Sequence, residues 1–362
     1  MLRDLRIENY RSFKNFQTDG LAQVNLFVGA NNSGKTSLLE AIYLLVNQNS
    51  PQCMAEILSN RGEIAERYVP SRISNEFVRS ASGYQIEHIF HGHKSKPAQI
   101  IRLRSKKDRR ISLEIELQDT KKQNRLLQDE TTGSDEDPST FVLQFSYGPG
   151  KDIEIPARDD GSIEMRSFRL ISREPYSHRF LTTDNLDFSQ LGKLWDGITL
   201  TPKEESVIQA LQILEPSVER ISFTSRQTSN TGILLKLGNQ QEPVPLGSMG
   251  DGMRRILTLA ASAVMAEGGV LLVDEIDTGL YYRTQADMWR LLIRTAKNLN
   301  LQIFATTHSL DCVRAFQESI NTGSDGAIGK LFRLSLRDSE IKAIPYTADE
   351  LTVAIEQEIE VR

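Results

Sequence analysis

The chain has 362 residues, of which 39% are hydrophobic and 25% are charged, and its formal net charge at pH 7 is −5. These values are typical of a soluble globular protein with a large core, and they exclude a general electrostatic attraction to nucleic acid. No apolar run is long enough to cross a bilayer and the N-terminus lacks the apolar region of a signal peptide, so we expect a cytoplasmic protein without membrane contact.

Residues 1–48 predict the first part of the core domain, which we call the head. Residues 2–10 alternate between apolar and polar side chains, which predicts a strand with one solvated face. Val24 to Val28 is an apolar run that predicts a second strand. Apolar periodicity from Leu38 then predicts a helix that ends near Asn47.

A glycine-rich loop of the form G-x-x-x-x-G-K-T, from Gly29 to Thr36, joins the second strand to this helix. Its two glycines allow a tight curl in which backbone N–H groups point into one concavity, at the positive end of the helix. Lys35 would then reach the β- and γ-phosphates of a nucleotide, and the Thr36 hydroxyl would bind Mg²⁺. A plain strand-to-helix connection is the alternative for such a loop.

Residues 49–245 predict an inserted lobe, rich in strands, together with remaining strands of the head. We expect a short helix near Ile57, a loop at 68–74 around Pro70, and a flexible polar loop at 118–139. Alternating patterns predict an antiparallel sheet, and the segment 163–171 returns the chain to the core. The sheet strands are 84–90, 99–104, 110–117 and 140–147; a helix at 204–214 and strands at 218–224 and 232–238 follow.

Residues 246–362 predict the second part of the head. A glycine-rich turn at 248–252 opens a helix, and two continuous apolar runs, 270–273 and 301–305, indicate strands that are buried on both faces of a mostly parallel sheet. The predicted fold class is therefore α/β, with an antiparallel β subdomain. Helices at 287–298 and 310–318, strands at 330–336 and 340–346, and a helix from 348 complete the chain.

Polar residues follow both buried strands. Asp274 and Glu275 end the first strand at the carboxyl edge of the sheet, where ligands bind in open α/β folds. Asp274 suits a water-mediated hold on Mg²⁺, and Glu275 suits the base that orients and deprotonates an attacking water. His308 closes the second strand, within reach of a γ-phosphate. Two solvated acids and a structural histidine are the plain alternatives.

The turn at Ser248 to Gly252 is a second anion site at a helix start, or simply a helix cap. In order, GANNSGKT, SMGDG, LLVDE and ATTHS resemble the Walker A, signature, Walker B and H-switch motifs of ABC-type ATPases. The opening LRIENYRSFKNF is similar to the first strand of the SMC, RecF and OLD branch. The resemblance covers residues 1–47 and 246–320, although SMGDG departs from the transporter-like LSGGQ.

This resemblance implies a P-loop head that binds ATP and Mg²⁺ and hydrolyses ATP. It implies that Ser248 acts on the nucleotide of a partner chain in a head-to-tail dimer, with Asp277 at the same interface, and it makes the segment 171–175 a candidate Q-loop. The implied catalytic residues are Glu275, His308 and Lys35, and the implied metal ligands are Thr36 and Asp274. The implied nucleotide-binding residues are Gly29, Asn31, Asn32, Ser33, Gly34, Lys35, Thr36, Ser37, Arg11, Ser248, Gly250 and Asp277.

The function expected from this resemblance is a dimeric ATP-hydrolysing switch in DNA repair or anti-phage defence. The lobe is too short for an SMC coiled coil, and about forty residues after the last ATPase helix leave no room for the Toprim nuclease of OLD proteins. We therefore expect a homodimer or higher oligomer that controls a separately encoded nuclease or other effector. The alternatives are an ATP-dependent assembly scaffold with little turnover and a RecF-like DNA-binding loader; an ABC transporter subunit is disfavoured.

Three weaker signals remain. The basic run 102–110 predicts either contact with a DNA or RNA backbone or a solvated hairpin. His88, His91 and His93 suggest a metal site, but in a strand only the last two share a face and no acid or thiol is nearby. Cys53 and Cys312 are isolated, so we expect neither a disulfide nor a thiolate zinc site.

Overall fold

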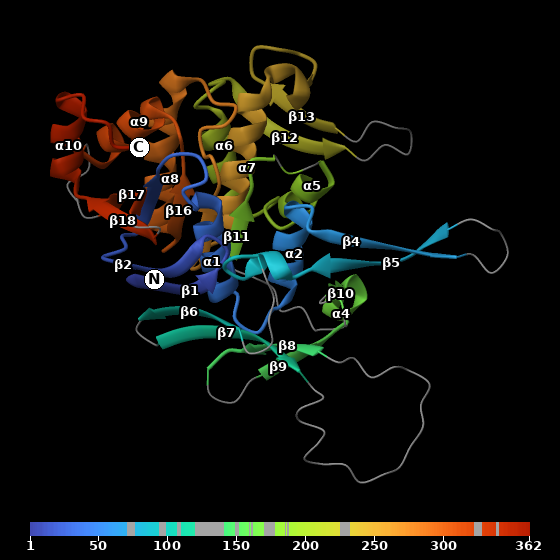
Figure 1. Cartoon of the computed structure of the whole chain (residues 1–362). Coiled ribbons are helices and arrows are strands. Elements are labelled where there is room, and N and C mark those ends of the chain that lie inside the picture. The colour runs from blue at the N-terminus through green and yellow to red at the C-terminus, as the bar shows by residue number, and fades with distance from the viewer. Residues whose placement is uncertain are drawn as a thin grey trace, which may run out of the picture.

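A six-stranded mixed sheet forms the centre of the protein (Figure 1), in the order β11-β15-β16-β3-β17-β18. Its first five strands are parallel, and only β18 runs antiparallel to its neighbour. The strands are β3 (Val24–Val28), β11 (His178–Leu181), β15 (Val270–Val273), β16 (Gln302–Thr306), β17 (Gly329–Arg337) and β18 (Glu340–Tyr346). The computed structural model describes residues 1–70, 77–93, 99–106, 110–119, 141–148, 152–158, 160, 162–169, 178–184, 186, 188–224, 232–321, 328–337 and 340–362.

The two faces of this sheet are buried by different layers. Side chains alternate along each strand, so Leu26 and Ala305 belong to one hydrophobic cluster and Phe27 and Phe304 to another. The first cluster packs against helices on one face, and the second packs against α1 (Lys35–Val46) on the other. The helices of the first face are α7 (Asp251–Met265), α8 (Gln285–Asn298), α9 (Leu310–Asn321) and α10 (Ala348–Glu356).

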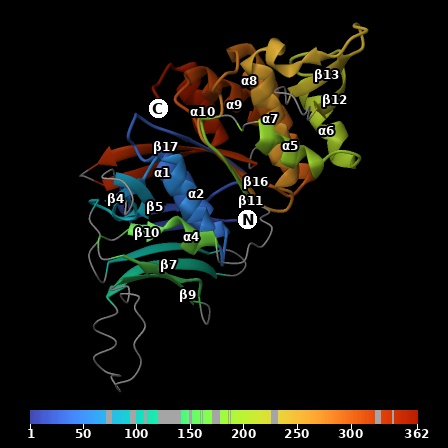
Figure 2. The same ribbon diagram turned by 90° about the vertical axis from the view of Figure 1, so that its right-hand side faces the viewer.

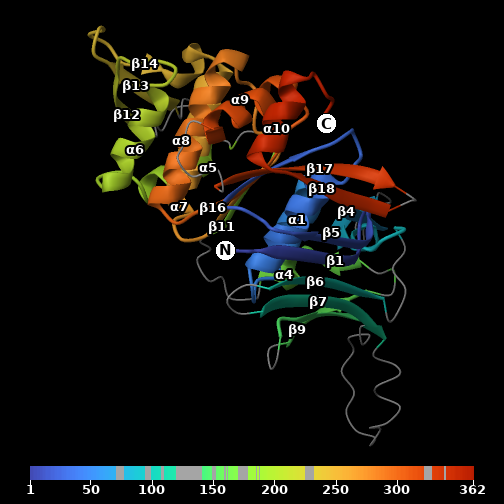
Figure 3. The same ribbon diagram turned by 90° about the vertical axis from the view of Figure 1, so that its left-hand side faces the viewer.

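An antiparallel sheet covers the outer side of α1, so that this helix lies between two sheets (Figure 3). Its order is β2-β1-β6-β7-β8-β9, and the N-terminal strands therefore join the lobe rather than the parallel core. The strands are β1 (Asp4–Tyr10), β2 (Phe13–Asp19), β6 (Ile100–Lys106), β7 (Arg110–Asp119), β8 (Phe141–Ser146) and β9 (Asp152–Ala157).

Two small sheets flank these layers. One contains the β4–β5 hairpin, which extends to the right in Figure 1. The other lies with α5 (Phe188–Asp196) and α6 (Pro202–Leu211) beside α7 (Figure 2). The first is β4 (Ile64–Pro70), β5 (Phe77–Gln85) and β10 (Ser162–Glu164), next to α2 (Gln52–Asn60) and α4 (Met165–Arg169). The second is β12 (Val218–Thr224), β13 (Gly232–Leu237) and β14 (Val244–Pro245).

The structure confirms the predicted α/β class, with a mostly parallel core sheet and an antiparallel subdomain. Two local predictions are wrong. Residues 68–70 end β4 instead of forming a loop, and the strand predicted at 84–90 stops at Gln85, where a 3-10 turn at Glu87–Ile89 begins. The turn forms because Ile86, Ile89 and Phe90 are all buried on one side, a spacing that suits a helical turn.

The sequence patterns missed β2, β4, β9, β11 and α5. The loop predicted at 118–139 lies almost entirely outside the described residues. The division at residues 48 and 245 stays a prediction. No helix in the described part of the chain is both long and apolar enough to span a membrane.

Candidate functional site

The glycine-rich loop opens the N-terminus of α1 toward the carboxyl edge of the core sheet. Gly34 is the N-cap with φ of 88°, no side chain caps the helix, and the first turn holds no acidic residue. A Cβ on Gly29 would lie 2.6 Å from the Leu334 carbonyl oxygen, so the loop can pass there only as glycine. The uncapped N–H groups of α1 thus remain available to an anion.

Lys35 lies folded into this loop. Its ammonium donates hydrogen bonds to the carbonyl oxygens of Gly29, at 2.9 Å, and Ala30, at 3.0 Å. Burial lowers the pKa of Lys35, although the charges of Asp274 and Glu275 act in the opposite direction. The Ser33 hydroxyl of the same loop is buried and has no hydrogen-bond partner among the described residues. A buried cation and an unused hydroxyl in one loop fit a phosphate group.

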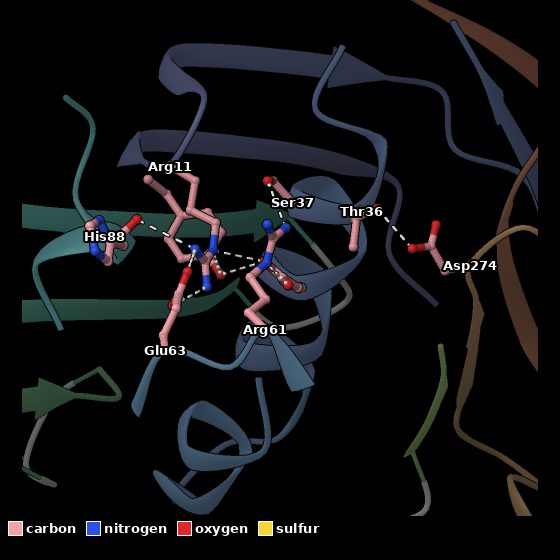
Figure 4. A network of polar contacts seen from close by, with 9 residues as sticks. Arg11, Thr36, Ser37, Arg61, Glu63, His88 and Asp274 are labelled. Carbon is pink, nitrogen blue, oxygen red and sulfur yellow. Dashed lines mark hydrogen bonds and ion pairs between the residues drawn. The ribbon is translucent and has the colours of Figure 1, made fainter. Parts of the chain in front are cut away.

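The predicted metal ligands touch each other. The Thr36 hydroxyl donates to Asp274 Oδ2 at 2.8 Å (Figure 4), and the Thr306 hydroxyl donates to Asp274 Oδ1 at 2.5 Å. Oxygen atoms of this kind are the ligands that Mg²⁺ prefers, with water and phosphate completing its shell. Within the described ranges no group of three His, Cys, Asp or Glu side chains could hold a metal alone. The pair therefore fits a cation that is shared with a phosphate.

Glu275 and His308 form the neighbouring pair. His308 Nε2 lies 3.1 Å from Glu275 Oε1. The Glu275 side chain is 40% exposed and the His308 side chain 38% exposed, so water can reach both. The backbone of Glu275 is left-handed, with φ of 44°, and its N–H donates to Thr306 Oγ1 at 2.9 Å. The parallel pairing of Val273 with Ala305 brings the ends of β15 and β16 together.

The signature turn makes its described contacts away from the phosphate loop. Ser248 is exposed in a 3-10 turn, where its hydroxyl donates to the Pro245 carbonyl at 2.7 Å, and Gly250 follows with φ of 88°. Asp277 accepts a hydrogen bond from the Thr307 hydroxyl at 2.5 Å. No contact recorded for the described residues joins Ser248 or Gly250 to Lys35, and the roles of Ser248, Gly250 and Asp277 stay predictions.

Arg11 is engaged by carboxylates (Figure 4). Its guanidinium binds both Glu63 oxygens, at 2.8 and 3.1 Å, and lies 2.8 Å from Glu40 on α1. Burial raises the pKa of Glu40, while Arg11 and Arg61 counteract the shift. Arg61 binds Glu40 at 2.6 Å and the Ser37 hydroxyl at 3.3 Å. The network anchors the first turns of α1 to the lobe, and nucleotide contact by Arg11 stays a prediction.

The remaining predicted nucleotide-binding residues lie in or beside the loop. Asn31 and Asn32 are exposed at its tip, where Asn32 has φ of 61°, and Ser37 is buried in the first turn of α1. A cavity of about 1000 Å³ reaches from Thr36 and Asp274 toward α2 and α5. The candidate Q-loop at 171–175 lies outside the described residues.

Two of the three weaker signals, the basic run and the histidines, have ordinary partners. On β6, Arg104 lies 2.7 Å from Glu114, and Arg102 lies 3.3 Å from the same carboxylate; residues 107–109 are not described. His91 Nδ1 donates to the Arg11 carbonyl at 2.8 Å. Residues 91–93 form a turn and a bend, so no strand places His91 and His93 on one face. Nucleic-acid contact stays a prediction.

Four residues that support the site were not predicted from the sequence. Thr306 and Thr307 bind Asp274 and Asp277, and their position within ATTHS was the available signal. Arg255 is fully buried on α7 and donates to the carbonyl oxygens of both acidic residues after β15. Its helical spacing with Leu259 and Ser262 placed it on the buried face. Arg362 donates to the His308 carbonyl at 3.0 Å, and no sequence signal pointed to this contact.

The model of a family described as "AAA domain, putative AbiEii toxin, Type IV TA system" matches residues 24–311 of the chain. Among curated proteins, an ATP/GTP phosphatase of Helicobacter pylori is 24% identical over 99% of each chain. The DNA replication and repair protein RecF of Lacticaseibacillus casei is 32% identical over 108 residues, which are 29% of this chain and 27% of that protein.

Among solved structures, the Smc head domain of Pyrococcus furiosus, with an extended coiled coil and bound to the C-terminal domain of ScpA, aligns with 99% of each chain. The TM-score is 0.50 and the sequence identity is 11%. This likeness shows a shared fold.

Proposed function

The chain belongs to this AAA-domain family and is an ABC-type ATPase of the SMC and RecF branch, and from that premise we propose that it works as a dimeric, nucleotide-driven switch. The observation that carries the proposal is the gathering of Lys35, the Thr36–Asp274 pair and the Glu275–His308 pair at the ends of three adjacent parallel strands. Each group has a role in phosphoryl transfer from a nucleotide to water.

In this proposal the uncapped end of α1, the Ser33 hydroxyl and Lys35 hold the phosphates. Thr36 and Asp274 hold Mg²⁺, which supplies charge neutralisation when it is bound. Glu275 orients the attacking water and accepts its proton on a carboxylate oxygen, while His308 Nε2 restrains that carboxylate from 3.1 Å away. Burial of Lys35 strengthens its attraction to phosphate, because the local dielectric is low.

The place of the signature turn supports the proposed dimer. Ser248 and Gly250 are exposed, and their described contacts lie outside the phosphate loop of their own chain. A second copy, packed head to tail, would bring this turn to the nucleotide, with Asp277 at the same interface. Since each nucleotide then bridges two chains, triphosphate favours association and hydrolysis favours release.

The wider role proposed for this cytoplasmic switch is DNA repair or anti-phage defence, in which it controls a separately encoded nuclease or other effector. The similarity to RecF supports repair, and the toxin–antitoxin description of the family supports defence. An assembly scaffold with little turnover and a RecF-like loader that binds DNA are the competing functions. Stimulation of turnover by DNA favours the loader, and association without appreciable turnover favours the scaffold.

The test measures Mg²⁺-dependent hydrolysis of ATP and of GTP, nucleotide affinity, and mass by light scattering. Glu275→Gln should lower kcat at least about 100-fold while it keeps nucleotide affinity and accumulates a dimer. Lys35→Ala should lose nucleotide binding. Glu267→Gln is the matched control, because this exposed glutamate pairs with Lys203 on the surface, outside the site.

Unchanged hydrolysis in Glu275→Gln would refute the assignment of the base. A single-chain mass at saturating ATP, in the same variant, would refute the dimeric switch. Ser248→Arg separates the two parts of the proposal, because it should abolish the dimer and leave nucleotide binding intact.

A further inference from the structure

Arg255 is a buried cation that no step of the proposed chemistry uses. Its exposed fraction is 0%. Within the described part of the chain, its guanidinium donates hydrogen bonds to carbonyl oxygens and forms no ion pair. One terminal nitrogen donates to Asp274 O at 3.1 Å and to Glu275 O at 2.9 Å, and the other donates to Thr182 O at 3.3 Å. Burial lowers the pKa of Arg255, and the charges of Asp277, Asp274 and Glu275 act in the opposite direction. Burying a cation that makes no direct ion pair is costly, so we looked for a specific role of this side chain.

Two side chains hold the backbone of Glu275. Its φ of 44° lies in the left-handed region, which an L-residue adopts only when its surroundings impose it. The Thr306 hydroxyl accepts the Glu275 N–H at 2.9 Å, and Arg255 donates to the Glu275 carbonyl at the same distance. The Glu275 carbonyl also accepts the Thr278 N–H at 3.0 Å, so Arg255 is one of the groups that fix the backbone from which the Glu275 carboxylate projects.

The helix that carries Arg255 begins at the signature turn. Asp251, one turn before Arg255, directly follows Gly250. A Cβ on Gly252 would lie 3.2 Å from the Gly279 carbonyl, which shows how closely the start of α7 approaches the segment after Asp277. The first turns of α7 are largely buried, so a displacement of the turn moves the helix as a unit.

We propose that Arg255 is a positioning residue that couples the signature turn to Glu275, so that the proton-accepting carboxylate is aligned only when the turn engages a nucleotide. This inference rests on the proposed dimeric switch. Contacts of 2.9 to 3.3 Å to three carbonyls fail with a shift of about 1 Å, because hydrogen bonds weaken steeply beyond their normal range. Arg255 thereby converts a small movement of α7 into the loss or gain of a working base.

The main test compares Arg255→Met and Arg255→Lys. Arg255→Met removes every donor and should lower kcat about 10- to 100-fold, with nucleotide affinity unchanged. Arg255→Lys keeps a donor for the Glu275 carbonyl and should recover part of this loss. Arg254→Met is the matched control on the same helix, because Arg254 donates to the Leu186 carbonyl instead; its kcat should stay within about 2-fold of wild type.

A double-mutant cycle separates positioning from a general structural effect. If Arg255 acts through Glu275, adding Arg255→Met to Glu275→Gln lowers the residual turnover no further. Independent losses that multiply in the double variant would overturn the proposal. So would wild-type turnover in Arg255→Met, or an equal loss in Arg255→Met and Arg254→Met.

A measurement without nucleotide provides a second readout. Amide hydrogen exchange in the peptide that contains Glu275 should be faster in Arg255→Met than in Arg254→Met, and equal rates would overturn the proposal. If Arg255→Met does not fold, Arg255→Lys takes its place in the comparison with Arg254→Met and in the double-mutant cycle with Glu275→Gln. The Glu275→Gln dimer is scored separately: its absence refutes the dimeric switch, whereas its presence with wild-type turnover in both Arg255 variants refutes only the role of Arg255.

Discussion

Thr306→Val should remove the hydrogen bonds that hold both acidic residues of the site, Asp274 and Glu275, while it preserves the shape of the core. The Thr306 side chain is completely buried at the end of β16, and valine has nearly the same volume. Its hydroxyl donates to Asp274 Oδ1 at 2.5 Å and accepts the Glu275 N–H at 2.9 Å. Valine removes both hydrogen bonds and leaves a carboxylate oxygen and an amide without their partner.

The magnitude follows from these two contacts. A hydrogen bond to a charged group is worth about 1.5–3 kcal/mol, and one from a neutral amide about 1 kcal/mol. Asp274 keeps its bond to Thr36, so we assign about 2 kcal/mol to the chemical step. This corresponds to a decrease of about 30-fold in kcat.

The assay is steady-state nucleotide hydrolysis, with affinity measured separately by titration. Thr306→Ser is the control, because it keeps the hydroxyl and loses one methyl group, which costs about 0.8 kcal/mol of stability; its kcat should stay within about 3-fold of wild type. Wild-type kcat in Thr306→Val, or an equal loss of kcat in the serine and valine variants, would refute the role of the Thr306 hydroxyl.

Three further predictions concern other contacts. Gly29→Ala should weaken nucleotide binding at least about 10-fold in titrations, because the new Cβ would lie 2.6 Å from the Leu334 carbonyl oxygen; unchanged affinity would contradict the steric argument. Arg362→Ala removes the hydrogen bond to the His308 carbonyl, worth about 1 kcal/mol, and should lower kcat about 5-fold at constant affinity; equal kcat would show that this contact is idle. Burial raises the pKa of Cys312 to about 12, so the unfolded thiol ionises first and the free energy of unfolding should fall as pH rises from about 9 toward 12. The free energy of unfolding of Cys312→Ala, measured by denaturant titration at each pH, should fall less between pH 9 and 12 than that of the wild type. An identical fall would exclude the thiol as its source.

The sequence alone predicted the parts of the site that depend on local chemistry. Gly29 and Gly34 shape a loop because only glycine tolerates its backbone, and Lys35 and Thr36 follow directly in the helix. The apolar runs that end at Val273 and Ala305 identified two buried strands. Parallel strands end at one edge of a sheet, so the chain order was enough to predict that Asp274 and Glu275 lie near His308.

Only the tertiary structure decided which distant side chains complete that site. The start of α7 is recognisable in the sequence, but the reach of Arg255 to the carbonyls of Asp274 and Glu275 depends on how α7 packs on the core sheet. The same holds for Arg362 and the His308 carbonyl, and for the carboxylates that enclose Arg11. Periodicity determines which face of an element is buried, whereas the partner of a buried polar atom is set by the register between elements that are far apart in the chain.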